Sequence, residues 1–135
     1  MTKKIKYIDG IRFYRSIVVG INNLISRQDY LNQINVFPVP DGDTGTNMAF
    51  TVNEILEGTS GTVSSKIGEM SQQVADLALD GARGNSGAIL AQFFVGLSES
   101  LEKKDKMSVQ DFAEAFRKAS DNAWDALSDP QEGTI

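Results

Sequence analysis

The sequence contains neither cysteine nor histidine. The absence of cysteine excludes a disulfide framework and thiolate chemistry. The absence of histidine excludes Ser-His-Asp catalysis, zinc sites built on histidine and histidine-based pH switches. Chemistry in this chain is therefore left to carboxylates, hydroxyls, amides and the backbone.

Positive charge and long apolar runs are also scarce. The 13 lysines and arginines are outnumbered by 18 aspartates and glutamates, which gives a net charge of −5 and a pI near 4.6. Nucleic acid is not expected as a partner, because a basic footprint is missing. No apolar run approaches the roughly 18 residues of a membrane-spanning helix. The basic residues 1–7 are not followed by the apolar stretch of a signal peptide, so the expected compartment is the cytoplasm.

The apolar content that is present suits one globular domain. The chain has 135 residues, and 41% of them are hydrophobic. We expect a polar lead-in over residues 1–8 and a single domain over residues 9–135. Apolar residues recur at helical spacing, and no strand-like alternation extends beyond a few residues. The predicted fold class is therefore all-α.

The apolar spacing predicts five main helices and one short turn. The first helix starts at an Asp9 N-cap, and the last follows a capping box formed by Ser108 and Asp111. The expected ranges are 9–25, 44–58, 64 or 65 to 80, 88–97 and 109–127, with the short turn at 30–34. Five aromatic residues at helical spacing are interpreted as core residues: Phe93, Phe94, Phe112, Phe116 and Trp124.

Short helices with short connections favour an antiparallel up-and-down bundle. In that topology the first helix ends beside residues 35–43, the third beside residues 81–87 and the last beside residues 129–134. All three segments then lie at the same end of the bundle. The connections at the opposite end, around Gly58 and Lys103, have ordinary turn composition. We therefore expect a composite site at the end of the bundle where the three segments meet.

The segment Asn35–Met48, which reads NVFPVPDGDTGTNM, is the most unusual stretch of the chain. Its two prolines keep residues 36–39 out of a helix. Asp41 and Asp43 follow, and glycines beside them allow a sharp turn. Thr44 or Thr46 is expected to cap the helix that begins there. Two carboxylates are thus predicted just before the N-terminus of a helix.

This arrangement suits a metal ion and a phosphate. A pair of aspartates with few nearby bases favours Mg²⁺, which takes oxygen ligands and shares them with substrate phosphates. The glycine-rich segment Gly84–Gly87 opens into a helix N-terminus, where backbone N–H groups favour an anion. Asn85 and Ser86 add donors there, and Arg83 can add positive charge. Together these features predict a Mg²⁺-nucleotide site and phosphoryl transfer.

Each feature alone also has a simpler, structural explanation. An Asp-Gly-Asp turn is usually structural, and a glycine-rich segment between helices is usually only a connection. The segment that starts at Asp41 is not an EF-hand loop, since Thr46 and Val52 occupy the positions that need glycine and glutamate. No lysine follows the glycines, which excludes a Walker A loop. Ser86 is not expected to act as a nucleophile, because no histidine base is available.

With its motifs in this order, the chain resembles the nucleotide-binding domain of the dihydroxyacetone kinase L-subunit superfamily. The segments that carry the resemblance are 35–48, 81–87 (GARGNSG) and 130–134 (PQEGT). Within the superfamily the chain is most similar to the N-terminal domain of bacterial fatty acid kinases. The resemblance covers residues 6–135 and implies an antiparallel helical barrel that holds ATP or ADP through Mg²⁺.

The resemblance also implies roles for individual residues. Asp41 and Asp43 would ligate Mg²⁺, with Asn35 as a third ligand where another branch has an aspartate. The residues expected to contact the nucleotide are Thr44, Gly45, Thr46, Asn47, Gly84, Asn85, Ser86, Gly87, Glu132, Gly133 and Thr134. The family domain continues with further helices, so the chain is expected to lack the last helices of the barrel.

Three functions stay open at this point. The first is the ATP–Mg²⁺-binding domain of a kinase for a small or lipid acceptor, most readily a fatty acid delivered by a separate carrier protein. The second is a dihydroxyacetone kinase subunit. The third is a non-catalytic nucleotide-sensing or helical interaction module. The oligomeric state is also open, with a homodimer as one expectation.

Overall fold

The computed structural model describes residues 3–134, and in this range the fold is helical. The elements in chain order are β1 (Ile8–Asp9), α1 (Gly10–Ser26), α2 (Gln28–Gln33), α3 (Thr44–Thr59), α4 (Ile67–Gly81), α5 (Gly84–Ser100), β2 (Lys106–Met107) and α6 (Val109–Trp124). The strands pair antiparallel, with Ile8 opposite Met107. The predicted all-α class is confirmed, since each strand has only two residues.

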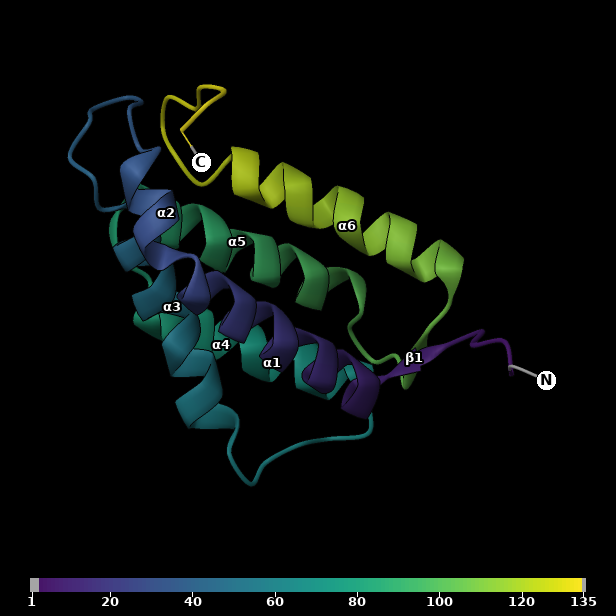
Figure 1. Cartoon of the computed structure of the whole chain (residues 1–135). Helices are drawn as coiled ribbons and strands as arrows, with labels where there is room; N and C mark the ends of the chain where they lie inside the picture. The colour runs from purple at the N-terminus through teal and green to yellow at the C-terminus, as the bar shows by residue number, and fades with distance from the viewer. Residues whose placement is uncertain (1–2, 135) are drawn as a thin grey trace.

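Consecutive helices pack side by side, as the up-and-down arrangement requires. Helix α3 packs on α4, α4 on α5, and α5 on α6, while α1 lies against both α3 and α4 (Figure 1). The two-stranded sheet joins the start of α1 to the start of α6 at one end of the bundle. Helix α2 and the loop after it lie at the opposite end.

Helix α4 supplies the centre of the core. Its residues Ile67, Met70 and Val74 are completely buried, at a spacing of three and four residues that defines one helix face. Val52 and Ile55 of α3 complete this buried layer. Burial of a side chain of this size contributes roughly 1.5–3 kcal/mol, so this layer holds the bundle together.

Helices α5 and α6 approach most closely at small residues. Ala115 and Ala119 of α6 are completely buried. Gly96 of α5 approaches so closely that a Cβ at this position would lie 2.6 Å from the Cα of Ala119. The two helices can therefore approach closely only where side chains are absent or short.

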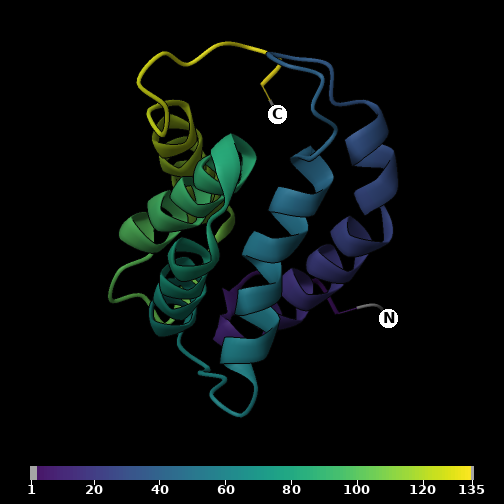
Figure 2. The same ribbon diagram turned by 90° about the vertical axis from the view of Figure 1, so that its left-hand side faces the viewer.

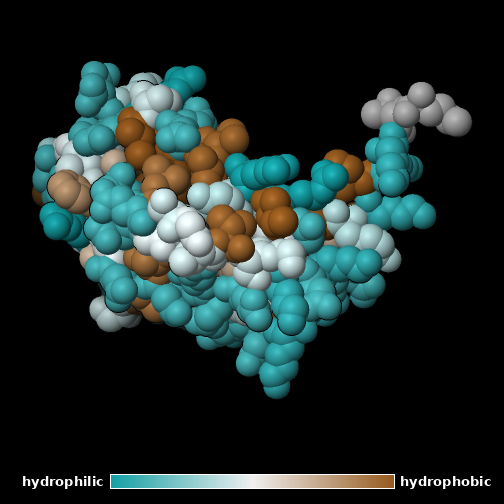
Figure 3. Space-filling model, turned by 90° about the horizontal axis from the view of Figure 1, so that it is seen from below, coloured by the Kyte–Doolittle hydropathy of each residue, from teal (hydrophilic) through white to brown (hydrophobic). Residues whose placement is uncertain are grey.

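This packing corrects the prediction that the aromatic residues of α6 are core residues. Phe112, Phe116 and Trp124 are 43%, 40% and 51% exposed, because α6 turns its alanine face towards α5. Phe116 still contacts Phe93 of α5 edge to face, with ring centroids 5.5 Å apart. Of the two predicted core aromatics on α5, Phe94 is buried and Phe93 is half-buried against the core. Apolar patches also interrupt the hydrophilic surface on the face seen in Figure 3.

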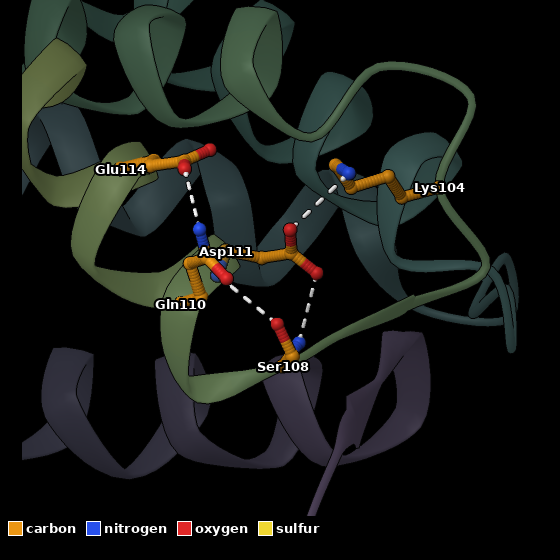
Figure 4. A network of polar contacts seen from close by, with 5 residues as sticks. All are labelled: Lys104, Ser108, Gln110, Asp111 and Glu114. Atoms are coloured by element: carbon orange, nitrogen blue, oxygen red, sulfur yellow. Dashed lines mark hydrogen bonds and ion pairs between the residues drawn. The ribbon is translucent and has the colours of Figure 1, made fainter.

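Two helix starts were predicted correctly from local signals. The Asp9 carboxylate accepts a hydrogen bond from the backbone N–H of Arg12 at 2.9 Å and caps α1. At the start of α6, Ser108 Oγ accepts from the Asp111 N–H at 3.1 Å, and Asp111 Oδ2 accepts from the Ser108 N–H at 3.0 Å (Figure 4). The predicted capping box is therefore confirmed.

Helices α4 and α5 begin elsewhere than predicted. Helix α4 starts at Ile67 and not at residue 64 or 65, because residues 64–66 are engaged in other contacts: the Ser65 carbonyl accepts from the Gly10 N–H at 2.8 Å. Helix α5 starts at Gly84, four residues before the predicted Ala88. The glycine-rich segment is thus mostly the first turn of a helix and not a loop.

Candidate functional site

A single side chain closes the loop between α2 and α3. Asn35 Oδ1 accepts hydrogen bonds from the backbone N–H groups of Asp43 at 3.1 Å and Thr44 at 3.3 Å. Its Nδ2 donates to the carbonyl of Val39 at 3.4 Å. One amide therefore holds the middle and the end of the loop together. Gly42, between the two aspartates, has a φ of +68°, a conformation that glycine adopts without strain.

The start of α3 is capped by residues outside the helix. The predicted caps, Thr44 and Thr46, do not serve this role; Asn35 accepts from Thr44 N–H, and Asn32 Oδ1 accepts from Thr46 N–H at 3.0 Å. The Thr46 hydroxyl instead accepts from Asn32 at 3.0 Å and from Gln28 at 3.2 Å. Thr46 therefore faces α2. No sequence signal pointed to Asn32 or Gln28, because α2 was expected only as a short turn.

Two hydrogen bonds join the start of α5 to α3. The buried Ser86 hydroxyl donates a hydrogen bond to the Thr44 carbonyl at 3.3 Å. The Arg83 N–H donates to Thr51 Oγ1 at 3.3 Å. Gly84 has a φ of +63°, and a Cβ there would lie 2.5 Å from the side-chain nitrogen of Asn47. The backbone conformation thus favours glycine at this position, and a Cβ would in addition displace the Asn47 side chain.

The three predicted segments meet around one cavity of about 270 Å³. It is lined by Asn35, Phe37, Pro38, Val39, Asp41, Asp43, Thr44, Asn47, Gly84, Asn85, Ser86 and Thr134. In Figure 2 the chain after α6 reaches across the end of the bundle towards the loop between α2 and α3. We call this space the aspartate cavity. The up-and-down topology was therefore sufficient to bring these residues together.

Five of the residues predicted to contact a nucleotide do not line the aspartate cavity. Gly45 is buried against α2, and Thr46 also points there. Gly87 is buried, and its Cα faces the hydroxyl of Thr51. Glu132 and Gly133 line cavities next to it. The structure thus separates the predicted set into residues that line the aspartate cavity, residues packed behind it and residues that line neighbouring cavities.

The aspartate cavity carries negative charge without a basic side chain in its lining. Both Asp41 and Asp43 are exposed to solvent. Arg83, which was expected to add positive charge here, places its guanidinium over the ring of Phe50 at 4.1 Å from the centroid and does not line the cavity. Within residues 3–134 no cluster of three or more carboxylate, histidine or cysteine ligands occurs. A cation bound by these two aspartates would need further oxygen ligands from water or from a bound molecule.

Comparison with known proteins gives a family match and several relatives. The sequence matches the model of the DAK2 domain over residues 38–135. It is 44% identical over 128 residues to an uncharacterised protein of Staphylococcus saprophyticus. The aligned region covers 95% of this chain and 23% of that protein. Uncharacterised proteins of Staphylococcus epidermidis and of Staphylococcus aureus strain USA300 are 43% and 40% identical over 131 residues, covering 97% of this chain and 24% of each protein. The chain spans about a quarter of the length of these curated relatives.

Proposed function

The chain belongs to the DAK2 domain family, and we propose that it is the ATP–Mg²⁺-binding domain of a kinase that transfers the γ-phosphoryl group to a small or lipid acceptor. The family suggests a nucleotide-binding domain of the dihydroxyacetone kinase type. One observation carries the proposal: two aspartates and the start of a long helix line the same cavity, which has no basic side chain in its lining.

The charge distribution explains why a metal is part of the proposal. A triphosphate would be repelled by two carboxylates at close range unless a cation neutralised part of the charge. Mg²⁺ is typically held by one or two carboxylates together with water and substrate phosphates. Asp41 and Asp43 fit this donor set. When bound, the ion would neutralise charge on the transferring phosphoryl group.

The phosphates are assigned to the other wall of the aspartate cavity. Helix α5 presents its N-terminus there, where the positive end of the helix dipole favours an anion. Asn85, Asn47 and Thr44 supply amide and hydroxyl groups around this point, whereas the Ser86 hydroxyl is bonded to the Thr44 carbonyl and holds the two helix starts together. These groups would orient the triphosphate, and positioning of this kind is the main contribution of proteins to phosphoryl transfer.

Asn35 is better suited to positioning than to metal binding. Its carbonyl oxygen has two lone pairs, and both are directed to backbone N–H groups of Asp43 and Thr44. Coordination of a metal by this oxygen would require these bonds to break. We therefore propose that Asn35 fixes the conformation in which the two aspartates are presented.

An apolar acceptor is favoured by a second cavity beside the first. This cavity has a volume of about 380 Å³ and is lined by Leu31, Ile34, Asn35, Val36, Phe37, Thr44, Met48, Gly133 and Thr134. It shares Asn35, Phe37, Thr44 and Thr134 with the aspartate cavity. An apolar wall so close to the proposed phosphates suits a fatty acid or its carrier protein better than a small ketose. We also propose a cytoplasmic location for this kinase domain. As a separate finding, none of the helices within residues 3–134 has the length and apolar character needed to span a membrane.

A phosphotransfer assay separates the alternatives. A chain extended beyond Ile135 to the length of its relatives is incubated with Mg²⁺ and γ-labelled ATP, with fatty acid on a carrier protein in one arm and dihydroxyacetone in the other. Label in the acyl phosphate supports the lipid kinase, and label in the ketose phosphate supports a dihydroxyacetone kinase. If Mg²⁺-dependent ATP binding is measured but neither acceptor is phosphorylated, the result favours the non-catalytic nucleotide-sensing module.

A further inference from the structure

Thr51, in the middle of α3, is a polar side chain that the bundle buries completely. Its hydroxyl donates a hydrogen bond to the Asn47 carbonyl at 2.8 Å, one turn earlier in the same helix. The same oxygen accepts from the backbone N–H of Arg83 at 3.3 Å. A threonine hydroxyl can donate and accept at the same time. Thr51 therefore joins a residue that lines the aspartate cavity to the residue that precedes α5.

The glycine-rich segment between α4 and α5 packs around this threonine. A Cβ on Gly87 would lie 2.5 Å from the Thr51 hydroxyl oxygen, and a Cβ on Gly81 would lie 3.0 Å from the Thr51 carbonyl oxygen. Arg83, which donates the hydrogen bond, lies between these two glycines in the sequence. The end of α4 and the start of α5 can thus approach Thr51 closely because both glycines lack a side chain.

The bond from Arg83 is made at the point where α5 begins. Arg83 is the N-cap residue of α5, and its carbonyl accepts the first intrahelical hydrogen bond, from the Gly87 N–H at 3.0 Å. The N–H groups of residues 84–86 lie before this bond, and N–H groups at such positions are the ones that a helix presents to an anion. By holding the Arg83 N–H, Thr51 fixes where these groups lie relative to the start of α3.

We propose that Thr51 is a positioning residue of the phosphate site. It touches no ligand, and its hydroxyl sets the distance between the first turn of α5 and the aspartates at the start of α3. The inference rests on the proposed function, because it takes the start of α5 as the place where phosphates bind. The bond between Ser86 and Thr44 joins the two helices beside the aspartate cavity, and Thr51 holds them further down α3 at a fully buried side chain.

The same helix provides a matched control. Thr59 is also completely buried, and its hydroxyl donates to the Ile55 carbonyl four residues earlier, as Thr51 donates to Asn47. Valine at either position replaces a buried hydroxyl by a methyl group and removes a hydrogen bond of the same kind. Thr51→Val and Thr59→Val should therefore both lower Tm. Of the two variants, only Thr51→Val also removes the acceptor of the Arg83 N–H.

Calorimetry with Mg²⁺ and either ATP or inorganic tripolyphosphate measures the effect on binding. Thr51→Val should weaken the binding of both ligands by about 10-fold or more, since loss of a group that orients ligand-binding residues typically costs 10- to 100-fold. Both ligands should respond alike, because they share the phosphate chain. Thr59→Val should leave both affinities unchanged. Thr51→Ser keeps the hydroxyl and should bind both ligands as the unaltered chain does.

A second variant and a second measurement approach the same hydroxyl without removing it or without using a ligand. Gly87→Ala keeps Thr51 but places a methyl group against its oxygen, so it should weaken the binding of both ligands as well. Hydrogen exchange of the Arg83 amide, followed by NMR in the absence of nucleotide, should be faster in Thr51→Val than in the unaltered chain. It should stay unchanged in Thr59→Val.

The outcomes separate this inference from the proposed function. Equal loss of affinity in the two valine variants would mean a general effect of stability and would overturn the positioning role. Unchanged ATP affinity in Thr51→Val or in Gly87→Ala, or a Thr51→Ser variant that binds as weakly as Thr51→Val, would overturn it too, and the proposed ATP–Mg²⁺ site would stand. If the unaltered chain binds neither ATP nor tripolyphosphate with Mg²⁺, the proposed function and this inference both fail.

Discussion

The side-chain oxygen of Asn35 lies 3.1 Å from the backbone nitrogen of Asp43 and accepts its hydrogen bond. The two residues are eight positions apart, at the two ends of the loop that carries both aspartates. The bond converts a chain segment with two prolines and two carboxylates into a closed loop at the start of α3. The positions of the two aspartates thus depend on the neutral side-chain amide of Asn35.

Replacement of Asn35 by alanine should weaken MgATP binding while both aspartates remain in place. The backbone N–H groups of Asp43 and Thr44 would lose their acceptor, which also removes a helix cap that is typically worth about 1 kcal/mol. Calorimetry and thermal unfolding measure the two effects. Asn22→Ala, at an exposed position of α1, is the control; it should leave ATP affinity unchanged and should not lower stability, because alanine is the better helix former. Full ATP affinity in Asn35→Ala would contradict the positioning role.

Thr46 and Thr44 should respond differently to substitution by valine. Thr46→Val removes the acceptor for Gln28 and Asn32, so it should lower stability by about 1 kcal/mol with little effect on MgATP affinity. Thr44→Val alters a side chain that lines the aspartate cavity and should weaken binding. Both variants are compared by denaturant unfolding and by calorimetry. A large loss of affinity in Thr46→Val at unchanged stability would mean that this hydroxyl contacts the nucleotide after all.

Gly84→Ala should destabilise the fold and impair binding together. Alanine at a positive φ costs roughly 1–2 kcal/mol, and the new Cβ would press on Asn47. Gly20→Ala is the matched control, since a Cβ there meets no atom within 4 Å. That control should gain about 0.5–1 kcal/mol, because alanine is the better helix former. Denaturant unfolding of the two variants should therefore give opposite signs; a stabilising Gly84→Ala would refute the strained geometry.

The capping box of α6 should make stability depend on pH. Hydrogen bonds from the backbone and hydroxyl of Ser108, and then from Lys104, lower the pKa of Asp111 below its ordinary value of 3.8. Since the folded pKa lies below the unfolded one, the stabilisation is complete above about pH 4 and disappears as pH falls through the folded pKa. Asp111→Ala should therefore lower Tm at pH 7, and the difference from the unaltered chain should shrink towards pH 2.

Glu114→Ala is the control for this pH dependence. It removes a carboxylate from the same helix that accepts a long hydrogen bond of 3.4 Å from the Gln110 side chain on the exposed surface (Figure 4). It should change Tm little at either pH. An Asp111→Ala deficit that stays constant from pH 7 to pH 2 would show that the ionised carboxylate is not the stabilising species.

Local signals and topology were enough to predict much of this molecule. The Asp9 cap and the Ser108 box depend on residues three positions apart, so sequence alone defines them. The meeting of residues 35–47, 84–86 and 134 follows from short connections in an up-and-down bundle, which leave few other places for these segments.

The predictions that failed concern packing between helices, which the spacing of residues in the sequence does not specify. Phe112 and Trp124 have helical spacing and apolar character, yet Gly96 and Ala119 set which face of α6 meets α5. Likewise, the direction of Thr46 is decided by α2, whose side chains provide its partners. The glycine-rich segment was predicted as a connection between helices, but Gly84 and Gly87 lie close to side chains of α3 and do not interrupt α5.

The central claim is that Asp41 and Asp43 bind nucleotide only through a divalent cation. Its most direct test is the Tm of the chain with ATP in Mg²⁺ or in EDTA, for the unaltered protein and for Asp41→Asn and Asp43→Asn. At a hundredfold excess of ligand over its Kd, binding stabilises a fold by about 2.7 kcal/mol, which raises Tm by several degrees. We predict this rise for the unaltered chain in Mg²⁺ alone, and its loss in EDTA and in both variants. An equal rise in EDTA, or in either asparagine variant, would contradict the claim.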